Sequence, residues 1–355
     1  MKVALVHWRL FNMGGLESRI RNYLAYFHER GDDVTIFCYK QSPDFPVPPS
    51  VKVVKLHLGA MPKPYRMWYF NHKLGKIFNK EDYDFSLTMG RTTQQTASLA
   101  PGDHLGFLEA IKRKIRKPKD WTQINLDKLS FASSDIIFPC SDFIKQNLIN
   151  LYGVSPSKLH TIYPPLDVSR FKRLSPDEKS ALADKYGMDK TKTTFVIAST
   201  AHKRKGIPLL LKLFKRLQDQ PVELLIAGRP KVRTRLPNVK FIGYVKKSEE
   251  LFAAADFSIH PALYEPFGQV ISESLACGTP VLISNNTGWS TNLPESYGRV
   301  VPTFSVEDWK AALLESIDKT YSIPENFGEV HELSLEKHME KMLKYYGEMV
   351  GKDLS

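Results

Sequence analysis

The sequence predicts an α/β protein with two domains, each built around a parallel sheet. Short β-rich runs alternate with amphipathic helical segments along the 355 residues, and this alternation is typical of parallel α/β sheets. The length suggests two domains of ordinary size. A stretch rich in Pro and charge at 160–178 separates two series of such runs, and we expect the linker there.

The first series carries one helical pattern between its first two candidate strands, because Leu16, Ile20, Leu24 and Phe27 recur on one helical face. The Pro-rich stretch 41–50 is expected to be a loop. The candidate strands are Val3–Trp8, Val34–Tyr39, Val51–Leu58, Phe85–Met89 and Ile136–Cys140.

The second series begins near Thr193 and carries a helix whose first turn contains Pro208. Its apolar stripe consists of Leu210, Leu213, Phe214 and Leu217. The candidate strands lie within 195–200, 222–228, 239–245, 257–262 and 280–285. A last helical pattern covers Leu335–Met349.

Composition narrows the class of protein. Hydrophobic residues make up 42%, which excludes a disordered chain. The formal charge of +12 favours an anionic partner such as a nucleotide, a phosphorylated sugar, an acidic membrane surface or nucleic acid. Cys38, Cys140 and Cys277 are scattered, which argues against a disulfide framework or a zinc site. With no signal peptide and no spanning segment recognised, we expect a soluble, cytoplasmic protein.

The most specific feature is the segment EPFGQVISESLACGTPVLISNNTG at 265–288, where two carboxylates, Glu265 and Glu273, stand eight residues apart. A helix is expected to open near Phe267, so that the backbone N–H groups of Phe267, Gly268 and Gln269 are first-turn donors. A carboxylate can also accept hydrogen bonds from the vicinal hydroxyls of a sugar. The alternative is a structural pair, in which Glu265 caps the helix and Glu273 is solvated.

A second feature is the basic loop AHKRKG at 201–206, between a strand and a helix. Fixed cations at the carboxyl end of a strand suit a diphosphate, so Arg204 and Lys205 are candidate phosphate ligands. A solvated basic loop is the alternative.

The segment 265–288 resembles the signature of retaining glycosyltransferases of family 4, also called glycosyl transferases group 1. The resemblance covers nearly the whole chain. It implies the GT-B architecture, two Rossmann-like domains facing a central cleft. It places an acceptor domain at 1–165, completed by the helix 335–350, and a nucleotide-sugar donor domain at 166–334. By this resemblance Glu273 holds the nucleotide ribose and Glu265 faces the donor sugar as a catalytic residue.

The basic loop departs from the family pattern. Many members carry Gly-Arg directly after this strand, whereas Ala198-Ser199-Thr200 stand here. The Arg-Lys-Gly that follows is kept, and the variant is similar to that of lipopolysaccharide-core glucosyltransferases.

Four other segments gain a role from the resemblance. The turn at Gly14 and Gly15 is expected to pack over the donor phosphate, although it is not the dinucleotide-binding G-x-G-x-x-G. Asp103 and His104 are expected to be catalytic residues near the reacting sugar. The residues expected to border the nucleobase are Gly228, Tyr244 and Val245.

No metal is expected. The D-x-D at Asp82-Tyr83-Asp84 precedes a candidate strand, as a helix-exit loop does, and no His/Cys cluster has ligand spacing. Basic segments with aromatic residues at 61–78 and 110–121 indicate contact with an anionic membrane surface or glycolipid, or else a solvated face. No nucleic-acid recognition motif accompanies them.

The sequence therefore predicts a metal-independent, retaining hexosyltransferase that needs no cofactor. We expect it to use a nucleotide diphosphate sugar, with UDP as the expected nucleotide, and a glycan or lipid-linked saccharide, as in lipopolysaccharide or cell-surface polysaccharide synthesis. The open alternatives are a nucleotide-sugar epimerase or phosphorylase of the same fold, a Rossmann oxidoreductase, or a nucleic-acid-binding protein.

Overall fold

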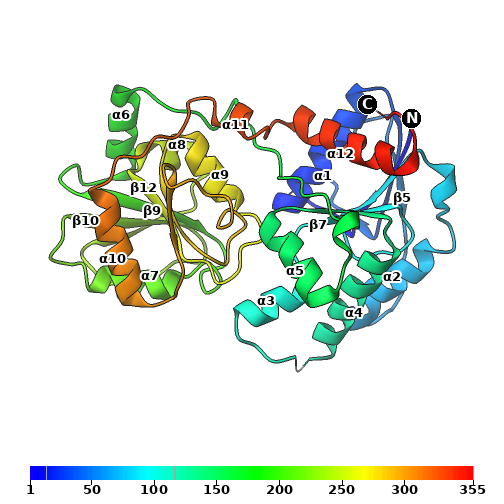
Figure 1. Ribbon diagram of the computed structural model, residues 1–355, viewed down its shortest axis with the longest axis horizontal. Helices are drawn as coiled ribbons and strands as arrows, with labels where there is room; N and C mark the ends of the chain where they lie inside the picture. The colour runs from blue at the N-terminus through cyan, green and yellow to red at the C-terminus, as the bar shows by residue number, and fades with distance from the viewer. Residues whose placement is uncertain (13, 116, 355) are drawn as a thin grey trace. The chain divides into compact units, whose positions relative to one another are not determined.

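The computed structural model describes residues 1–12, 14–115 and 117–354. These form two compact units (Figure 1). Unit 1 comprises Met1–Pro165 and the C-terminal segment from Leu335, and unit 2 comprises Leu166–Ser334. Each unit contains a six-stranded sheet whose neighbouring strands are all parallel, which confirms the predicted α/β class.

The sheet of unit 1 has the strand order β5-β3-β1-β6-β7-β8. Counted along the chain this is 3-2-1-4-5-6, the order of the Rossmann fold. The strands are β1 (Lys2–Val6), β3 (Asp33–Cys38), β5 (Lys52–Lys55), β6 (Phe85–Thr88), β7 (Ala97–Ala100) and β8 (Ile136–Pro139). A small separate ladder pairs β2 (Arg9–Leu10) with β4 (Lys40–Gln41).

Helices cover both faces of this sheet. On one face α1 (Gly15–Glu29) lies beside α12 (Leu335–Val350), as Figure 1 shows, and both contribute to one apolar core. Helix α1 does so because Ile20, Tyr23, Leu24 and Phe27 fall on one side of it. The opposite face is covered by α2 (Arg66–Leu74), through Phe70 and Leu74. The remaining helices are η1 (Lys63–Tyr65), η2 (Lys80–Asp82), α3 (His104–Ala110), α4 (Pro118–Ser133), α5 (Asp142–Tyr152) and η3 (Pro156–Lys158).

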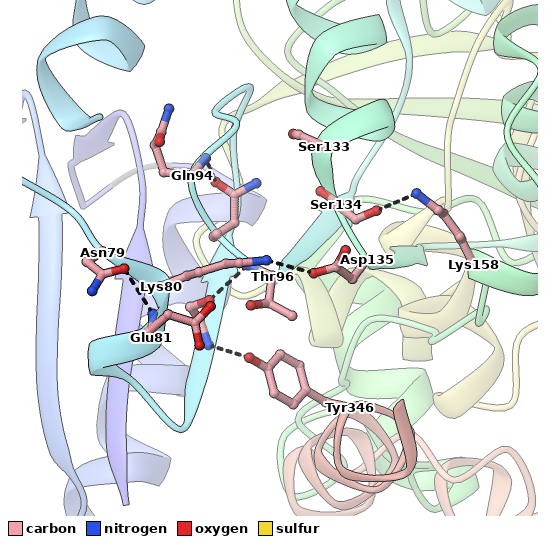
Figure 2. Close-up of polar contacts among 12 residues, drawn as sticks. Asn79, Lys80, Glu81, Gln94, Thr96, Ser133, Ser134, Asp135, Lys158 and Tyr346 are labelled. Carbon is pink, nitrogen blue, oxygen red and sulfur yellow. Dashed lines mark hydrogen bonds and ion pairs between the residues drawn. The ribbon is translucent and has the colours of Figure 1, made fainter. Parts of the chain in front are cut away.

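Helix α12 is bonded into unit 1 by buried side chains. The hydroxyl of Tyr346 accepts the N–H of Ser86 in β6 at 3.2 Å (Figure 2). The hydroxyl of Tyr23 lies 2.5 Å from Nε2 of His338, whose Nδ1 donates to the carbonyl of Tyr163 at 2.7 Å. Burial lowers the pKa of His338 to about 3, so the ring is neutral and serves as one donor and one acceptor.

Unit 2 repeats the same topology. Its strand order is β11-β10-β9-β12-β13-β14, again 3-2-1-4-5-6 along the unit. The strands are β9 (Thr193–Ser199), β10 (Val222–Gly228), β11 (Val239–Gly243), β12 (Phe257–His260), β13 (Val281–Ser284) and β14 (Gly298–Val301). The helices are α6 (Pro176–Tyr186), α7 (Ile207–Lys215), α8 (Ser248–Ala254), α9 (Gln269–Ala276), α10 (Val306–Ile317) and α11 (Phe327–Val330). Helices α7 and α10 pack side by side on one face, while α8 and α9 contact strands of the sheet.

The structure contains four strands that the sequence did not predict, namely β2, β4, β7 and β14, and one helix starts at a different residue. β7 could not be recognised in the sequence, because ASLA lacks the β-branched residues that mark strands. Helix α9 begins at Gln269 rather than near Phe267, because Gly268 has φ +90° and precedes the first helical residue.

Candidate active site

The candidate site of unit 2 lies where its strand order reverses. β9 and β12 are neighbours in the sheet, and the chain leaves them toward opposite edges. Ligands of open α/β sheets bind outside the carboxyl ends of the strands at such a point. The basic loop follows β9 and the Glu265 segment follows β12, so the topology brings the two strongest sequence signals to one place.

Glu265 makes ion pairs with both predicted phosphate ligands. Its Oε2 lies 2.7 Å from Nζ of Lys205 and 2.8 Å from Nη1 of Arg204. The side chain of Lys205 is only 11% exposed, and that of Glu265 is 15% exposed. Burial alone would raise the pKa of the Glu265 carboxyl, but the charges of Lys205 and Arg204 outweigh it, and the pKa lies below its ordinary value. Glu265 is therefore ionised and leaves one excess positive charge in the cluster.

Backbone contacts hold the two loops together. The N–H of Leu263 donates to the carbonyl of Arg204 at 2.8 Å, and Nη1 of Arg204 donates to the carbonyl of Tyr264 at 2.7 Å. Gly206 has φ +80°, and a Cβ there would lie 2.0 Å from the carbonyl oxygen of Pro261. Only glycine permits this approach, which sets Lys205 beside Glu265.

Glu273 lies in the second turn of α9, in a different electrostatic environment. Burial raises the pKa of its carboxyl to about 7, while the charges of Arg170 and Lys205 act in the opposite direction. Among the described residues, none makes a hydrogen bond or ion pair with this carboxylate. A partly buried acceptor without a protein partner is a suitable ligand for sugar hydroxyls.

Three neighbours of the two glutamates were not singled out from the sequence. Nε and Nη2 of Arg170 both donate to Oε2 of Glu249, at 2.8 and 2.6 Å, and both residues influence Glu273. His260, at the end of β12, is buried, and burial together with the charge of Lys205 lowers its pKa to about 3. No local motif marks these residues, because they meet the glutamates only through the fold.

The residues predicted to border a nucleobase follow the next strands of the same sheet edge. Gly228 ends β10 with φ +132°, and a Cβ there would lie 1.8 Å from the carbonyl oxygen of Ser199. Tyr244 and Val245 follow β11, and Tyr244 is 62% exposed. The guanidinium of Arg229 lies 4.8 Å from the centroid of the Tyr244 ring, which makes a flat cationic and aromatic surface.

Phe267 and Gly268 connect Glu265 to α9. The Phe267 side chain is buried against Trp289, so only its backbone can face a ligand. Gly268 is the N-cap of α9 and accepts the N–H of Ile271 at 2.8 Å. Gln269 is the first residue of the helix.

Four predicted site residues belong to unit 1. Gly14 has φ +127° and is the N-cap of α1, and Gly15 is the first residue of that helix. The neighbouring Met13 lies outside the described residues. Gly14 and Gly15 thus form the turn that the sequence predicted, at the start of the helix.

Asp103 and His104 make contacts that stabilise unit 1. Asp103 caps α3, since its Oδ1 accepts the N–H of Gly106, and its Oδ2 accepts from Asn147 at 2.8 Å. Nε2 of His104 lies 2.9 Å from Asp120, a buried residue of α4. These contacts join α3 to α4 and α5, and the catalytic role of the pair stays a prediction.

The D-x-D segment has a structural explanation. Asp82 ends the short helix η2, and Asp84 accepts the N–H of Lys2 at 2.9 Å. Across residues 1–12, 14–115 and 117–354, no group of three His, Cys, Asp or Glu side chains could hold a metal ion. Metal independence itself stays a prediction.

Two Rossmann-like units in one chain, with a cationic site at the switch point of the second, define the GT-B class of glycosyltransferases. Family models cover both units: "Glycosyltransferase Family 4" matches residues 13–170, and "Glycosyl transferases group 1" matches residues 178–332. The chain belongs to the group 1 glycosyltransferases of GT-B fold.

Curated relatives match over much of the chain. A protein named "Probable transglycosylase" of Burkholderia thailandensis is 29% identical over 275 residues, which cover 78% of this chain and 75% of the relative. A GDP-mannose-dependent phosphatidylinositol monomannoside mannosyltransferase of Corynebacterium glutamicum is 24% identical, with 86% of each chain covered.

Solved structures share the fold. WaaG, described as a glycosyltransferase involved in lipopolysaccharide biosynthesis, superposes with a TM-score of 0.73 at 17% identity, covering 98% of each chain. Anabaena HepE in complex with UDP-glucose gives a TM-score of 0.71 at 16% identity, covering 98% of this chain and all of the other. In the part of the chain that the structure describes, no helix is both long and apolar enough to cross a membrane.

Proposed function

We propose that this glycosyltransferase moves a hexose from a UDP-linked donor to a glycan or lipid-linked saccharide, with retention of the anomeric configuration. The observation that carries the proposal is the cluster of Arg204, Lys205 and Glu265 at the carboxyl edge of the unit 2 sheet. A group 1 glycosyltransferase needs a site for the anionic part of its donor, and this cluster combines two fixed cations with a partly buried environment.

In this proposal Arg204 and Lys205 bind the diphosphate and stabilise the charge that develops on it as the sugar bond breaks. Fixed cations in a site of low polarity perform this task without reorganisation. The acceptor hydroxyl attacks the sugar on the face that the nucleotide leaves. Glu265 orients the donor sugar, and Glu273 accepts hydrogen bonds from ribose hydroxyls. We assign no covalent nucleophile.

The choice of UDP rests on similarity. HepE is described in complexes with UDP and UDP-glucose, and WaaG is described as part of lipopolysaccharide biosynthesis. The relative from Corynebacterium glutamicum depends on GDP-mannose instead, so a donor panel has to contain both bases. Lipopolysaccharide or cell-surface polysaccharide synthesis is the proposed setting.

We also propose that unit 1 contacts anionic membrane from the cytoplasmic side. The two basic and aromatic segments are neighbours, because η1 packs against α4. Large exposed apolar side chains belong to this region: Tyr65, Trp68, Ile77, Trp121 and Leu129. Phe70, an aromatic residue of the segment 61–78, is only 1% exposed and belongs to the core beneath α2, so it cannot contact a membrane.

The basic side chains of 110–121 differ in whether they are available to contact lipid headgroups. Arg113 is paired with Asp120 at 2.7 Å, and Arg116 lies outside the described residues. The exposed lysines that remain for anionic headgroups are Lys112, Lys114, Lys117 and Lys119.

A thermal-shift screen tests the donor assignment, because a ligand that binds the native state raises its melting temperature. UDP-glucose, UDP-galactose, GDP-mannose and ADP-glucose are compared at equal concentration, and we expect the UDP sugars to give the largest shift. A larger shift with GDP-mannose would reject UDP. Product analysis with the best donor then separates transfer from hydrolysis or epimer formation. Transfer that persists in EDTA supports metal independence, and loss restored only by a divalent ion contradicts it.

A further inference from the structure

A hollow of about 370 Å³ opens on the surface of unit 1 beside α2. Its lining comes from α2, from the two residues after it and from the loop between β6 and β7. The lining residues are Trp68, Asn71, His72, Gly75, Lys76 and Gln94. None of them belongs to the site in unit 2, and the volume lies within the range of small-molecule sites.

One wall of the hollow carries two parallel aromatic rings. The rings of Trp68 and His72 are parallel within 5°, with their centroids 5.8 Å apart, because residues four positions apart stack on a helix. Trp68 is 52% exposed although it is a large apolar side chain. This aromatic ledge, formed by Trp68 and His72, suits the apolar face of a pyranose ring, because the C–H groups of a sugar pack on aromatic rings.

The rest of the lining is polar. Oδ1 of Asn71 accepts the N–H of Thr93 at 2.9 Å, and Nε2 of Gln94 donates to the Thr93 hydroxyl at 2.9 Å. These bonds fix both amides at the edge of the hollow. Within the described parts of the chain, no hydrogen bond or ion pair is made by the Lys76 ammonium, the His72 ring or the indole N–H of Trp68. All three can donate to hydroxyl or carboxylate oxygens.

Gly75 keeps the hollow open. Its φ of −60° is ordinary for any residue, so backbone conformation does not require glycine. A Cβ there would lie 3.1 Å from Nε2 and 3.2 Å from Cδ of Gln94. A larger side chain would therefore occupy the space beside the amide.

We propose that this hollow binds a pyranose ring of a glycan, with an acidic sugar bound more tightly than a neutral one. The aromatic ledge packs against the ring, while the Gln94 amide, Lys76 and His72 meet its oxygens. The lining contains one lysine and no carboxylate, which gives the preference for an acidic sugar. The site adds a carbohydrate contact to unit 1 that the donor site of unit 2 does not provide.

The test uses the full chain on an array of neutral and acidic oligosaccharides, followed by titration of the best ligand. We expect Trp68→Ala and Gly75→Val each to lower the affinity for that ligand at least tenfold. Trp121→Ala is the matched control, since Trp121 is an exposed tryptophan that does not line the hollow. The thermal shift given by UDP should be the same in all three variants, which separates this site from the donor site.

Three results would overturn the proposal. One is an array on which the wild-type chain binds no oligosaccharide. Another is a bound oligosaccharide whose affinity is unchanged by both Trp68→Ala and Gly75→Val. The third is an equal loss of oligosaccharide affinity in Trp68→Ala and in the control Trp121→Ala, which would show that the effect does not come from the lining of the hollow.

Discussion

Nζ of Lys205 lies 2.7 Å from Oε2 of Glu265, and both side chains are nearly withdrawn from solvent. The carboxylate thus occupies, in the free protein, the position of an anion between the cations of the basic loop. A donor diphosphate brings its own negative charge to the same cations. Glu265 and the donor therefore compete for, or share, Lys205 and Arg204.

Glu265→Gln should destabilise the free protein by about 2–3 kcal/mol, because it leaves buried positive charge without a partner. The loss is smaller than for a fully buried pair, since the Arg204 side chain is 32% exposed. UDP should restore stability in the variant more than it stabilises the wild type, while turnover falls. Urea unfolding with and without UDP measures this, and identical UDP effects in both proteins would refute the shared-cation interpretation.

Replacing both Arg204 and Lys205 by alanine should weaken UDP binding at least about 100-fold, because charge-assisted hydrogen bonds contribute about 1.5–3 kcal/mol each. The affinity for uridine, which has no phosphate, should change little in the same variant. Lys203→Ala is the control, since Lys203 is exposed in the same loop. Calorimetric titration of both ligands gives the comparison, and equal losses for uridine and UDP would indicate a folding defect.

Glu273→Gln should stabilise the protein at high pH. The pKa of Glu273 is raised from 4.5 to about 7, so its contribution to stability is complete below pH 4.5 and is lost as the pH rises through 7. The loss in the wild type amounts to about 3 kcal/mol. The variant has no such loss, so its advantage in free energy of unfolding should grow from pH 5 to pH 8. Glu325→Gln, at an exposed carboxylate, should show no such trend.

Gly228→Ala should unfold or severely destabilise unit 2, because the new Cβ would lie 1.8 Å from the Ser199 carbonyl oxygen in a strained conformation. Gly243→Ala is the matched control. Gly243 also has positive φ, at +78°, but a Cβ there meets no atom within 4 Å. We expect a cost of about 1 kcal/mol at Gly243 and several times more at Gly228. Equal melting temperatures of the two variants would show that the backbone at Gly228 can shift to accept a side chain.

Binding to vesicles should require anionic lipid and fade at high salt, as the screening length falls from ~10 Å at 0.1 M to ~3 Å at 1 M. Replacing Lys112, Lys114 and Lys117 by serine should weaken it roughly 100-fold, since each basic residue contributes about 1 kcal/mol. Cosedimentation measures this. The control replaces three exposed lysines of unit 2, namely Lys212, Lys215 and Lys319. Equal binding to neutral and anionic vesicles, or no binding to either, would indicate that the two basic segments form a solvated face and contradict the membrane proposal.

The sequence predicted the fold class well because most strands of both sheets are buried apolar runs separated by amphipathic helices. It missed β7 because Ala97–Ala100 consists of small residues whose burial is decided by the sheet around them. It also predicted a helix opening after Glu265 but not its start, since the φ of Gly268 cannot be derived from residue type.

The candidate site could be predicted as two motifs but not as one cluster. Arg204 and Glu265 are 61 positions apart, and only the adjacency of β9 and β12 brings them into contact. The same limit applies to Arg170, which lies in the expected linker and reaches Glu249 across 79 positions. Asp103 and His104 were predicted from residue type and resemblance; in the structure Asp103 caps α3 and His104 contacts the buried Asp120, and their catalytic role stays a prediction.

The return of α12 to unit 1 fixes the order in which the chain can be completed during synthesis. Unit 2 is continuous in sequence. In unit 1, by contrast, the apolar face of β1 and β6 is completed by Met339, Met342 and Tyr346 of α12, which are synthesised last. During synthesis on the ribosome, all residues of unit 2 have therefore been made before unit 1 receives its last helix. Chaperones that recognise bare apolar surface have their longest opportunity at the N-terminal half, and a stop codon before Leu335 would damage the half made first.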